Sequence, residues 1–400
     1  MQNYSGKICP IDRSIPCDAL EGIRVVELTE YVAAPVCGRM LADYGAEVIK
    51  IEKAYGDPYR LVGNNTNCGA AEDENPLFDI LNSGKKSVVL NLKDPEGMAS
   101  FHKLLETADV FLTSNRLISL KKLGIDPESL AEKYPALVYG LITGYGIDGP
   151  EKDEPGFDSV AFWGRSGFMR SAPYEDSGYP MPTPTGVGDS VTGIMLLTGL
   201  LAALFKRQRT GKGDFVTVSL FGASIWANNN MVIMTEPKYG DKYPISRQES
   251  NPYACCYKCS DGEWIQIGIM DYARYMPKLM DVLGVPDMFE DPRFATQVAA
   301  RSYWAEMLRI FEKQFMLKSS KEWLKIIKSI DVVCCILPRF CDIVSDRQAW
   351  ANGNVETFVF PNQQECVMPC PPVRFGSTGT MKSTVGPLLG EHTEEVLNSL

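Results

Sequence analysis

The first half of the chain alternates short apolar runs with amphipathic segments, which is the pattern of a parallel α/β sheet. Residues 23–28 and 48–51 are apolar enough to form strands that are covered on both faces. Between them, Pro35 suits the first turn of a helix and Gly45 suits its end. This order predicts one βαβ unit.

The same alternation continues and predicts a doubly wound sheet. Strands are expected at 87–92, 110–112, 137–142 and 214–220, and a helix is expected from 95 to about 107. Ligands of such sheets bind outside the carboxyl ends of the strands. A single cation there is typical of a solvated surface, but repeated cations at one edge favour a phosphate-rich ligand. The cations at or just beyond the expected strand ends are Lys53, Arg60, Lys93, Arg116 and Lys122.

One acidic residue stands between a glycine-rich turn and a long apolar helix. The turn is Gly186-Val187-Gly188, the acid is Asp189, and the apolar run covers residues 194–205. An acid at this place is either a plain helix N-cap or a carboxylate held at a glycine-lined opening. In the second case, the free N–H groups of the first turn would stabilise a reacting carbonyl oxygen.

The second half of the chain predicts a smaller α+β domain inserted into the large one. Residues 235–252 are polar and rich in proline, Asp261-Gly262 indicates a β-hairpin, and amphipathic helices are expected around 270–284 and 302–328. The expected organisation is an N-terminal arm at 1–18 and a large domain at 19–227. The small domain follows at 228–330, and 331–400 return to the large domain.

Composition narrows the possible functions. The net charge of −10, without a basic block, argues against a nucleic-acid partner. The longest apolar run is shorter than the ~20 residues that span a bilayer, and the N-terminus lacks the pattern of a signal peptide. We therefore expect a cytoplasmic protein with no membrane partner.

Two common ligand classes are also disfavoured. The turn at 29–35 follows the first strand but has no G-x-G-x-x-G pattern, so NAD is not expected, although Glu52 ends the second strand. The chain has 12 cysteines, with a cluster at Cys255, Cys256 and Cys259. Its two histidines, His102 and His392, stand far from any cysteine pair in sequence, so we expect reduced thiols and no metal.

Taken together, these motifs make the chain resemble the family III CoA-transferases, the CaiB/BaiF group. The resemblance covers residues 20–400 and rests on the order and spacing of its motifs. They are LEGIRVVELTEYVAAPVCGRMLADYGAEVIKIEKAYGDPYR, NSGKKSVVLNLKDPEG, PGFDSVAFWGRSG, GVGDSVTGIMLLTGLLAALFKRQRTGKGDFVTVSLF and PLLGEHTEEVL. The resemblance implies a large Rossmann-like domain made from both ends of the chain, with a smaller α+β domain inserted. It also implies an interlocked homodimer.

The resemblance assigns roles to particular residues. It implies that Asp189 is the nucleophile, that an acyl-CoA thioester is the co-substrate, and that no cofactor is tightly bound. Arg116 departs from several relatives, which have a small or aromatic residue there. The CoA contacts that the resemblance implies are Val32, Ala33, Lys53, Leu90, Lys93, Asn115, Arg116, Lys122 and Asp158.

The chemistry expected from this resemblance is CoA transfer between carboxylic acids. Asp189 would attack the acyl-CoA carbonyl and give an aspartyl anhydride, with N–H groups of residues 186–190 or a loop of the small domain holding the oxyanion. Nearby aromatic residues would exclude water or simply pack in the core; they are Phe157, Phe162, Trp163 and Phe168.

Details of the sequence favour one branch of the family. EDENPLFDILNSGKKS, YKCSDGEWIQ and DRQAWAN resemble the branch that acts on 2-hydroxy and 2-enoyl acids in amino-acid fermentation. A bile-acid or carnitine-type transferase is the alternative. A 2-methylacyl-CoA racemase is disfavoured, because Phe157 stands where such a racemase has its histidine base. A CoA-binding protein without catalysis would not need Asp189.

Overall fold

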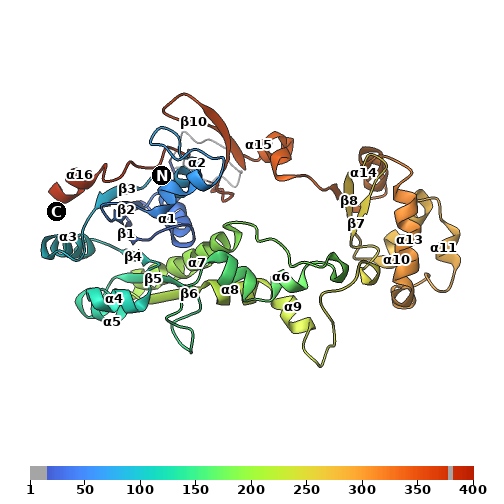
Figure 1. Ribbon diagram of the computed structural model, residues 1–400, viewed down its shortest axis with the longest axis horizontal. Coiled ribbons are helices and arrows are strands. Elements are labelled where there is room, and N and C mark those ends of the chain that lie inside the picture. The colour runs from blue at the N-terminus through green and yellow to red at the C-terminus, as the bar shows by residue number, and fades with distance from the viewer. Residues whose placement is uncertain (1–15, 377–381) are drawn as a thin grey trace. The chain divides into compact units, whose positions relative to one another are not determined.

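The computed structural model describes residues 16–376 and 382–400, so most of the arm expected at 1–18 lies outside the described residues. The chain divides into two compact units. The larger unit takes the chain up to Phe168, Pro182–Ile233 and Val344–Leu400, and the smaller unit takes Met169–Met181 and Met234–Ile343. Each unit has its own sheet (Figure 1).

A six-stranded parallel sheet organises the larger unit, as the sequence predicts. The strand order is β3-β2-β1-β4-β5-β6. The order reverses beside β1, whose neighbours are β2 and β4, and a ligand crevice is expected at such a reversal. The strands are β1 (Arg24–Leu28), β2 (Glu47–Glu52), β3 (Lys86–Val89), β4 (Val110–Thr113), β5 (Val138–Thr143) and β6 (Phe215–Ser219).

Two helices, α1 (Ala33–Asp43) and α7 (Val187–Thr210), cover one face of this sheet and pack against each other. They approach closely at Gly193, where a Cβ atom would clash with the carbonyl oxygen of Ala33. By length and composition alone, α7 is apolar enough to cross a membrane. In this chain it packs against α1, β5 and β6, which is the environment of a core helix.

The opposite face of the sheet is covered by helices from both ends of the chain. Alternate strand residues point to this face, so Val26, Ile49 and Phe111 pack with Phe101 and Leu130 of the helices. The last helix lies beside β3 (Figure 1), and the N–H of His392 donates to the carbonyl oxygen of Ser87 at 3.0 Å. The helices are α3 (Pro95–Glu106), α4 (Leu117–Leu123), α5 (Pro127–Lys133) and α16 (Thr393–Asn398).

The remaining elements of the larger unit are short. A hairpin near the C-terminal end packs against α2 through Phe358, Met368 and Ile80. The larger unit also contains η1 (Pro58–Asn65), α2 (Pro76–Asn82), η2 (Asp158–Gly164), α8 (Leu220–Ala227), α15 (Arg347–Ala351), β10 (Val355–Val359) and β11 (Glu365–Pro369). The helices α6 (Phe168–Ser171) and α9 (Asn229–Met234) and the turn η6 (Phe340–Ser345) straddle the division between the units.

The smaller unit combines a three-stranded antiparallel sheet with helices. The hairpin predicted at Asp261-Gly262 is confirmed, because β7 (Cys256–Lys258) pairs with β8 (Trp264–Gly268). The strand β9 (Val333–Ile336) follows the expected boundary at 330 and pairs with β8 in this unit. The domain boundaries drawn from the sequence stay a prediction. The short elements are η3 (Glu175–Ser177), η4 (Arg247–Glu249), η5 (Arg301–Tyr303), α11 (Asp287–Glu290) and α12 (Gln297–Ala300).

One helix of the smaller unit was predicted incorrectly. The segment 302–328 forms two helices, α13 (Trp304–Phe315) and α14 (Ser320–Ser329), while α10 (Tyr272–Val282) is a single helix as expected. The break has a local cause, because Ser319 and Glu322 form a capping box that starts a new helix.

Candidate active site

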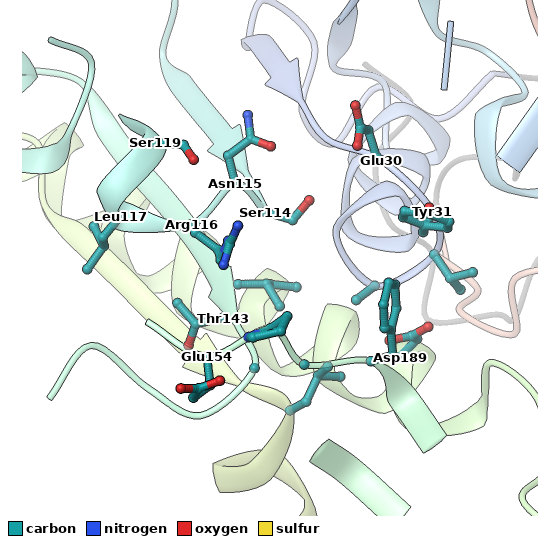
Figure 2. Close-up of a pocket in the computed structure, with 18 of the residues that line it drawn as sticks. Glu30, Tyr31, Ser114, Asn115, Arg116, Leu117, Ser119, Thr143, Glu154 and Asp189 are labelled. Carbon is teal, nitrogen blue, oxygen red and sulfur yellow. The ribbon is translucent and has the colours of Figure 1, made fainter. Parts of the chain in front are cut away.

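A cavity of about 300 Å³ opens in the larger unit where the strand order reverses. Its walls are the loops that follow β1, β4 and β5, together with the start of α7. Asp189 and Tyr31 lie on one side of the cavity, and Asn115, Arg116 and Ser119 lie on the other (Figure 2). The crevice expected from the sheet order therefore coincides with the acid that the sequence singled out.

Asp189 is not the N-cap of its helix, so that interpretation of the sequence is wrong. The N-cap is Gly186, whose φ of 74° lies in the left-handed region that glycine adopts without strain. Asp189 is the third residue of α7, half-buried, and its side chain faces the cavity. No described residue, from 16 to 376 or from 382 to 400, donates a hydrogen bond to its carboxylate.

A second carboxylate, Asp158, occupies the N-terminus of α7 from outside the helix. Its two oxygens accept hydrogen bonds from the N–H groups of Gly186 at 3.0 Å and Asp189 at 3.2 Å. Gly188 lies so close that a Cβ atom there would clash with Oδ1 of Asp158. Asp158 therefore accepts hydrogen bonds from the free N–H groups of the first turn. The positive end of the helix dipole stabilises its negative charge.

This arrangement contradicts one of the two expected sources of oxyanion donors, the N–H groups of residues 186–190. The N–H groups of Gly186, Gly188 and Asp189 face Asp158, and the N–H of Ser190 donates to the carbonyl oxygen of Gly186. The N–H of Val187 is directed at the carbonyl oxygen of Pro184. Groups already engaged in this way are not available to a substrate oxygen, so the donors must come from another segment.

Burial and the neighbouring carboxylate change the protonation of Asp189. Burial, followed by the negative charge of Asp158, raises the pKa of Asp189 to about 7. Burial also raises the pKa of Asp158, although the N–H groups around it oppose the shift. Tyr59 lies near enough that Asp189 contributes, after burial, to the raised pKa of its phenol. Asp189 therefore changes its protonation near neutral pH.

The CoA contacts implied by the resemblance fall into three groups. Val32, Ala33, Asn115 and Arg116 line the cavity with Asp189. Lys53 lines a smaller adjoining cavity, which shares Asn115 with the first, and its ammonium group pairs with Glu30 at 2.6 Å. The others line neither cavity: Leu90 is buried in the core, Lys93 and Lys122 are exposed, and Asp158 holds the helix.

Arg60 was expected to be a candidate for phosphate binding, and the structure gives it another role. Its guanidinium donates two hydrogen bonds to Glu52, at 2.9 and 2.6 Å, and one to the carbonyl oxygen of Pro387. Glu52 also accepts from the hydroxyl of Ser87. Both side chains are therefore committed to joining β2, β3 and the C-terminal segment.

Several cavity residues were not found from the sequence, and two of them, Lys152 and Tyr31, bear on the function. Lys152 lines the cavity from the loop after β5, and its place beyond a strand end is the signal in the sequence that could have identified it. Tyr31 has a φ of 66°, which is rare for a residue other than glycine. Nothing in the sequence around Tyr31 indicates this conformation.

A buried charge network holds the loop that carries Tyr31. The N–H of Tyr31 donates to Oδ1 of Asp57 at 3.0 Å, and Oδ2 of Asp57 pairs with the fully buried Lys50 at 3.0 Å. Lys50 also contacts Glu27, which pairs with the buried Lys85. Because each buried charge has an opposite partner, the network fixes the start of the site without leaving an uncompensated ion.

Comparison of the sequence with known proteins identifies its family. A family model, CoA-transferase family III, matches residues 20–393. The chain belongs to CoA-transferase family III. It is 39% identical over 382 residues to (R)-2-hydroxy-4-methylpentanoate CoA-transferase of Clostridioides difficile, covering 95% of each chain. It is 37% identical to cinnamoyl-CoA:phenyllactate CoA-transferase of Clostridium sporogenes, covering 95% of this chain and 92% of that one.

A solved structure supports the same assignment. The crystal structure of a CaiB/BaiF family protein from Brucella suis is similar with a TM-score of 0.79 and 28% sequence identity, covering 95% of this chain and 98% of that one. The protein is therefore an enzyme, a family III CoA-transferase, and a CoA thioester is its co-substrate. The resemblance drawn from the sequence motifs is confirmed.

Proposed function

We propose that this family III CoA-transferase moves CoA from an acyl-CoA thioester to a free 2-hydroxy or 2-enoyl acid, with Asp189 as the nucleophile. The observation that carries the proposal is the placement of Asp189. It is the acid at the start of α7 that faces the cavity, and its carboxylate accepts no hydrogen bond from the described part of the chain. A desolvated carboxylate is a competent nucleophile towards a thioester.

The proposed reaction conserves the thioester in four steps. The Asp189 carboxylate attacks the acyl-CoA carbonyl, which forms a mixed anhydride and releases CoA thiolate. The thiolate attacks the aspartyl carbonyl, which gives an aspartyl thioester and the free donor acid. The acceptor carboxylate attacks that thioester, which forms a second anhydride and releases the thiolate again. The thiolate then attacks the acceptor's carbonyl, which yields the new acyl-CoA and restores Asp189.

The charges around the cavity favour one orientation of the acyl-CoA. Arg116 and Lys152 supply cations at the cavity, and Lys122 lies one helical turn beyond Ser119 on α4. Lys53 lines the adjoining cavity. We place the phosphates of CoA toward these cations and the thioester at Asp189, because phosphates require local positive charge in a chain with a net charge of −10.

The acid that receives CoA is inferred from the names of two relatives, which are 39% and 37% identical to this chain. Their names specify 2-hydroxy-4-methylpentanoate in one case and cinnamoyl-CoA with phenyllactate in the other. Both names combine a short acid with a branched or aromatic side chain, which agrees with the motifs of the sequence. The alternative, a steroid acid or betaine acceptor, predicts that a substrate panel shows transfer to those acids and not to 2-hydroxy acids.

Localisation and assembly belong to the same proposal. We propose a cytoplasmic homodimer whose subunits interlock, as the family resemblance implies. Exposed apolar side chains of the larger unit would be removed from water by such an interface. They include Val160, Ile194, Phe205, Ile225, Trp226 and Ile233. Light scattering that gives a monomer at micromolar concentration would contradict this part.

The nucleophile is tested by trapping. The protein is incubated with cinnamoyl-CoA, treated with hydroxylamine, digested and analysed by mass spectrometry. We expect a hydroxamate on the peptide that contains Asp189, and none in Asp189→Asn. Asp148→Asn is the matched control, since Asp148 is an exposed carboxylate outside the cavity. A hydroxamate that persists in Asp189→Asn would refute Asp189 as the nucleophile.

A further inference from the structure

Two aromatic rings that the proposed mechanism does not use face the cavity beside Asp189. Tyr31 and Phe157 lie edge to face, with ring centroids 5.5 Å apart and an interplanar angle of 85°. Both line the cavity, and both are open to solvent, with exposed fractions of 40% and 57%. Large apolar side chains exposed inside a pocket are candidates for ligand contact, because binding would remove them from water.

Both rings lie on segments that approach the turn that presents the nucleophile. Phe157 directly precedes Asp158, whose carboxylate accepts the N–H of Asp189. Tyr31 directly precedes Val32, and a Cβ atom at Gly186 would lie 3.8 Å from Cγ1 of Val32, which is ordinary contact distance. Figure 2 shows Tyr31 on the side of the cavity where Asp189 lies, away from Arg116.

The structure holds Tyr31 in a conformation that its backbone does not favour. Its φ of 66° is retained by the hydrogen bond from its N–H to Asp57, which the buried Lys50 fixes in turn. Left-handed backbone at a residue other than glycine persists only where the surroundings determine it, and such residues gather at functional sites. The loop therefore fixes the backbone from which the Tyr31 ring reaches the cavity.

The charges nearby restrict what such a subsite accepts. Glu30 and Asp189 line the cavity on the same side as Tyr31 (Figure 2), Lys53 pairs with Glu30, and the carboxylate of Asp158 accepts a hydrogen bond from the N–H of Asp189. Once the acyl group is attached to Asp189, a second carboxylate on it would still meet the negative charge of Asp158, whereas an apolar side chain would cover the two rings. Aromatic groups gain further from edge-to-face contact with them.

We propose that Tyr31 and Phe157 form the subsite for the side chain of the acid, and that they select aromatic or branched apolar acids over small or dicarboxylic ones. This inference rests on the proposed function, because it requires the acyl group to be attached at Asp189. The two rings are specificity-determining residues, and the chemistry of transfer does not depend on them.

The test compares acceptors in one enzyme. We would measure kcat/KM for phenyllactate, lactate and succinate with cinnamoyl-CoA as the fixed donor, in the wild type and in Tyr31→Ala and Phe157→Ala. In a ping-pong reaction the kcat/KM of the acceptor is independent of the donor half-reaction, so donor effects do not enter the ratio. We expect the ratio of phenyllactate to lactate to fall by about 10-fold to 100-fold in each variant. Wild-type transfer to succinate should be slower than to phenyllactate.

Conservative variants and a measurement of assembly complete the design. Tyr31→Phe keeps the ring pair and should keep the ratio of phenyllactate to lactate within about twofold of the wild type. Phe157→Leu should lower this ratio less than Phe157→Ala does. Equal losses for phenyllactate and lactate would overturn the inference, because the rings would then contact CoA or serve only the fold. A variant whose only change is the oligomeric state measured by light scattering would overturn it as well.

The two proposals fail in different ways. A wild-type enzyme that transfers CoA to no acid would refute the proposed function together with this inference. A wild-type enzyme that transfers CoA to phenyllactate, with a ratio that the alanine variants leave unchanged, would refute the subsite alone.

Discussion

Replacing Asp158 by asparagine separates its charge from its position beside Asp189. The substitution keeps the size of the side chain and one oxygen, which continues to accept from the N–H of Gly186 or Asp189. It removes the negative charge that, after burial, contributes to the raised pKa of Asp189. We therefore expect Asp158→Asn to lower the pKa of the nucleophile.

The structure sets an upper bound on this effect. The pKa of Asp189 rises from 3.8 to about 7, and the charge of Asp158 is the smaller of the two causes. It therefore accounts for less than half of the rise, so the pKa should fall by at most about 1.5 units, or about 2 kcal/mol. Tyr59 does not interfere, because its own pKa is raised and its phenol stays neutral over this range.

The assay is the pH dependence of kcat/KM for the acyl-CoA donor between pH 5 and 9, which reports the free enzyme. In the wild type we expect an acid limb with a midpoint near pH 7, because only ionised Asp189 attacks. In Asp158→Asn the midpoint should move to lower pH while the plateau falls, since one N–H of the first turn loses its acceptor.

The control is Glu154→Gln, which removes an exposed negative charge that also lines the cavity. Its midpoint should move by less than about 0.3 units, because solvent screens exposed charges. If the two variants shift the midpoint equally, or if Asp158→Asn raises it, the assignment of Asp158 as the neighbouring charge would be refuted.

Three further predictions concern stability and binding. Asp189→Asn should raise the free energy of unfolding at pH 8 by up to about 4 kcal/mol. A carboxyl with a raised folded pKa lowers stability only as pH rises from about 4 toward 7, so urea titrations at pH 4 should give a difference of less than about 1 kcal/mol. Lys50→Met should lower the free energy of unfolding by about 3–5 kcal/mol, because Glu27 and Asp57 lose their buried partner; a urea midpoint equal to that of the wild type would contradict it. Lys152→Ala should raise the KM for acyl-CoA several-fold at unchanged kcat, and the difference should shrink with added salt in steady-state assays; a fall in kcat alone would count against a phosphate contact.

The sheet and the place of the site follow from the sequence because both depend on local patterns. Six apolar runs predict six strands, and the rule that ligands bind at strand ends directs attention to the loops after β1 and β4. The rule does not say what a cation at a strand end does. Arg60 and Arg116 both follow strands in sequence, yet Arg60 is committed to Glu52 while Arg116 lines the cavity.

The error at Asp189 has a physical cause, which is that side chains distant in sequence compete for the same groups. The N-cap interpretation of Asp189 assumed that the first turn of α7 had no other acceptor. Asp158 fills that role from 31 residues away in the chain. The break before α14 was missed for a simpler reason, because the Ser319–Glu322 capping box is local but lies inside a continuous amphipathic pattern.

The roles of the two carboxylates follow from the hydrogen bonds that each accepts. Both lie next to glycine-rich or apolar segments. The family resemblance implies that Asp189 is the nucleophile and that Asp158 is a CoA contact. In the structure, both oxygens of Asp158 accept hydrogen bonds from N–H groups at the start of α7, which stabilises its charge. Asp189 receives no such bond from the described residues, so its charge is costly and its pKa is raised. The same lack of solvation that destabilises the ionised Asp189 makes it the more reactive carboxylate, and Asp158 supports that state by fixing the turn and by adding its own charge.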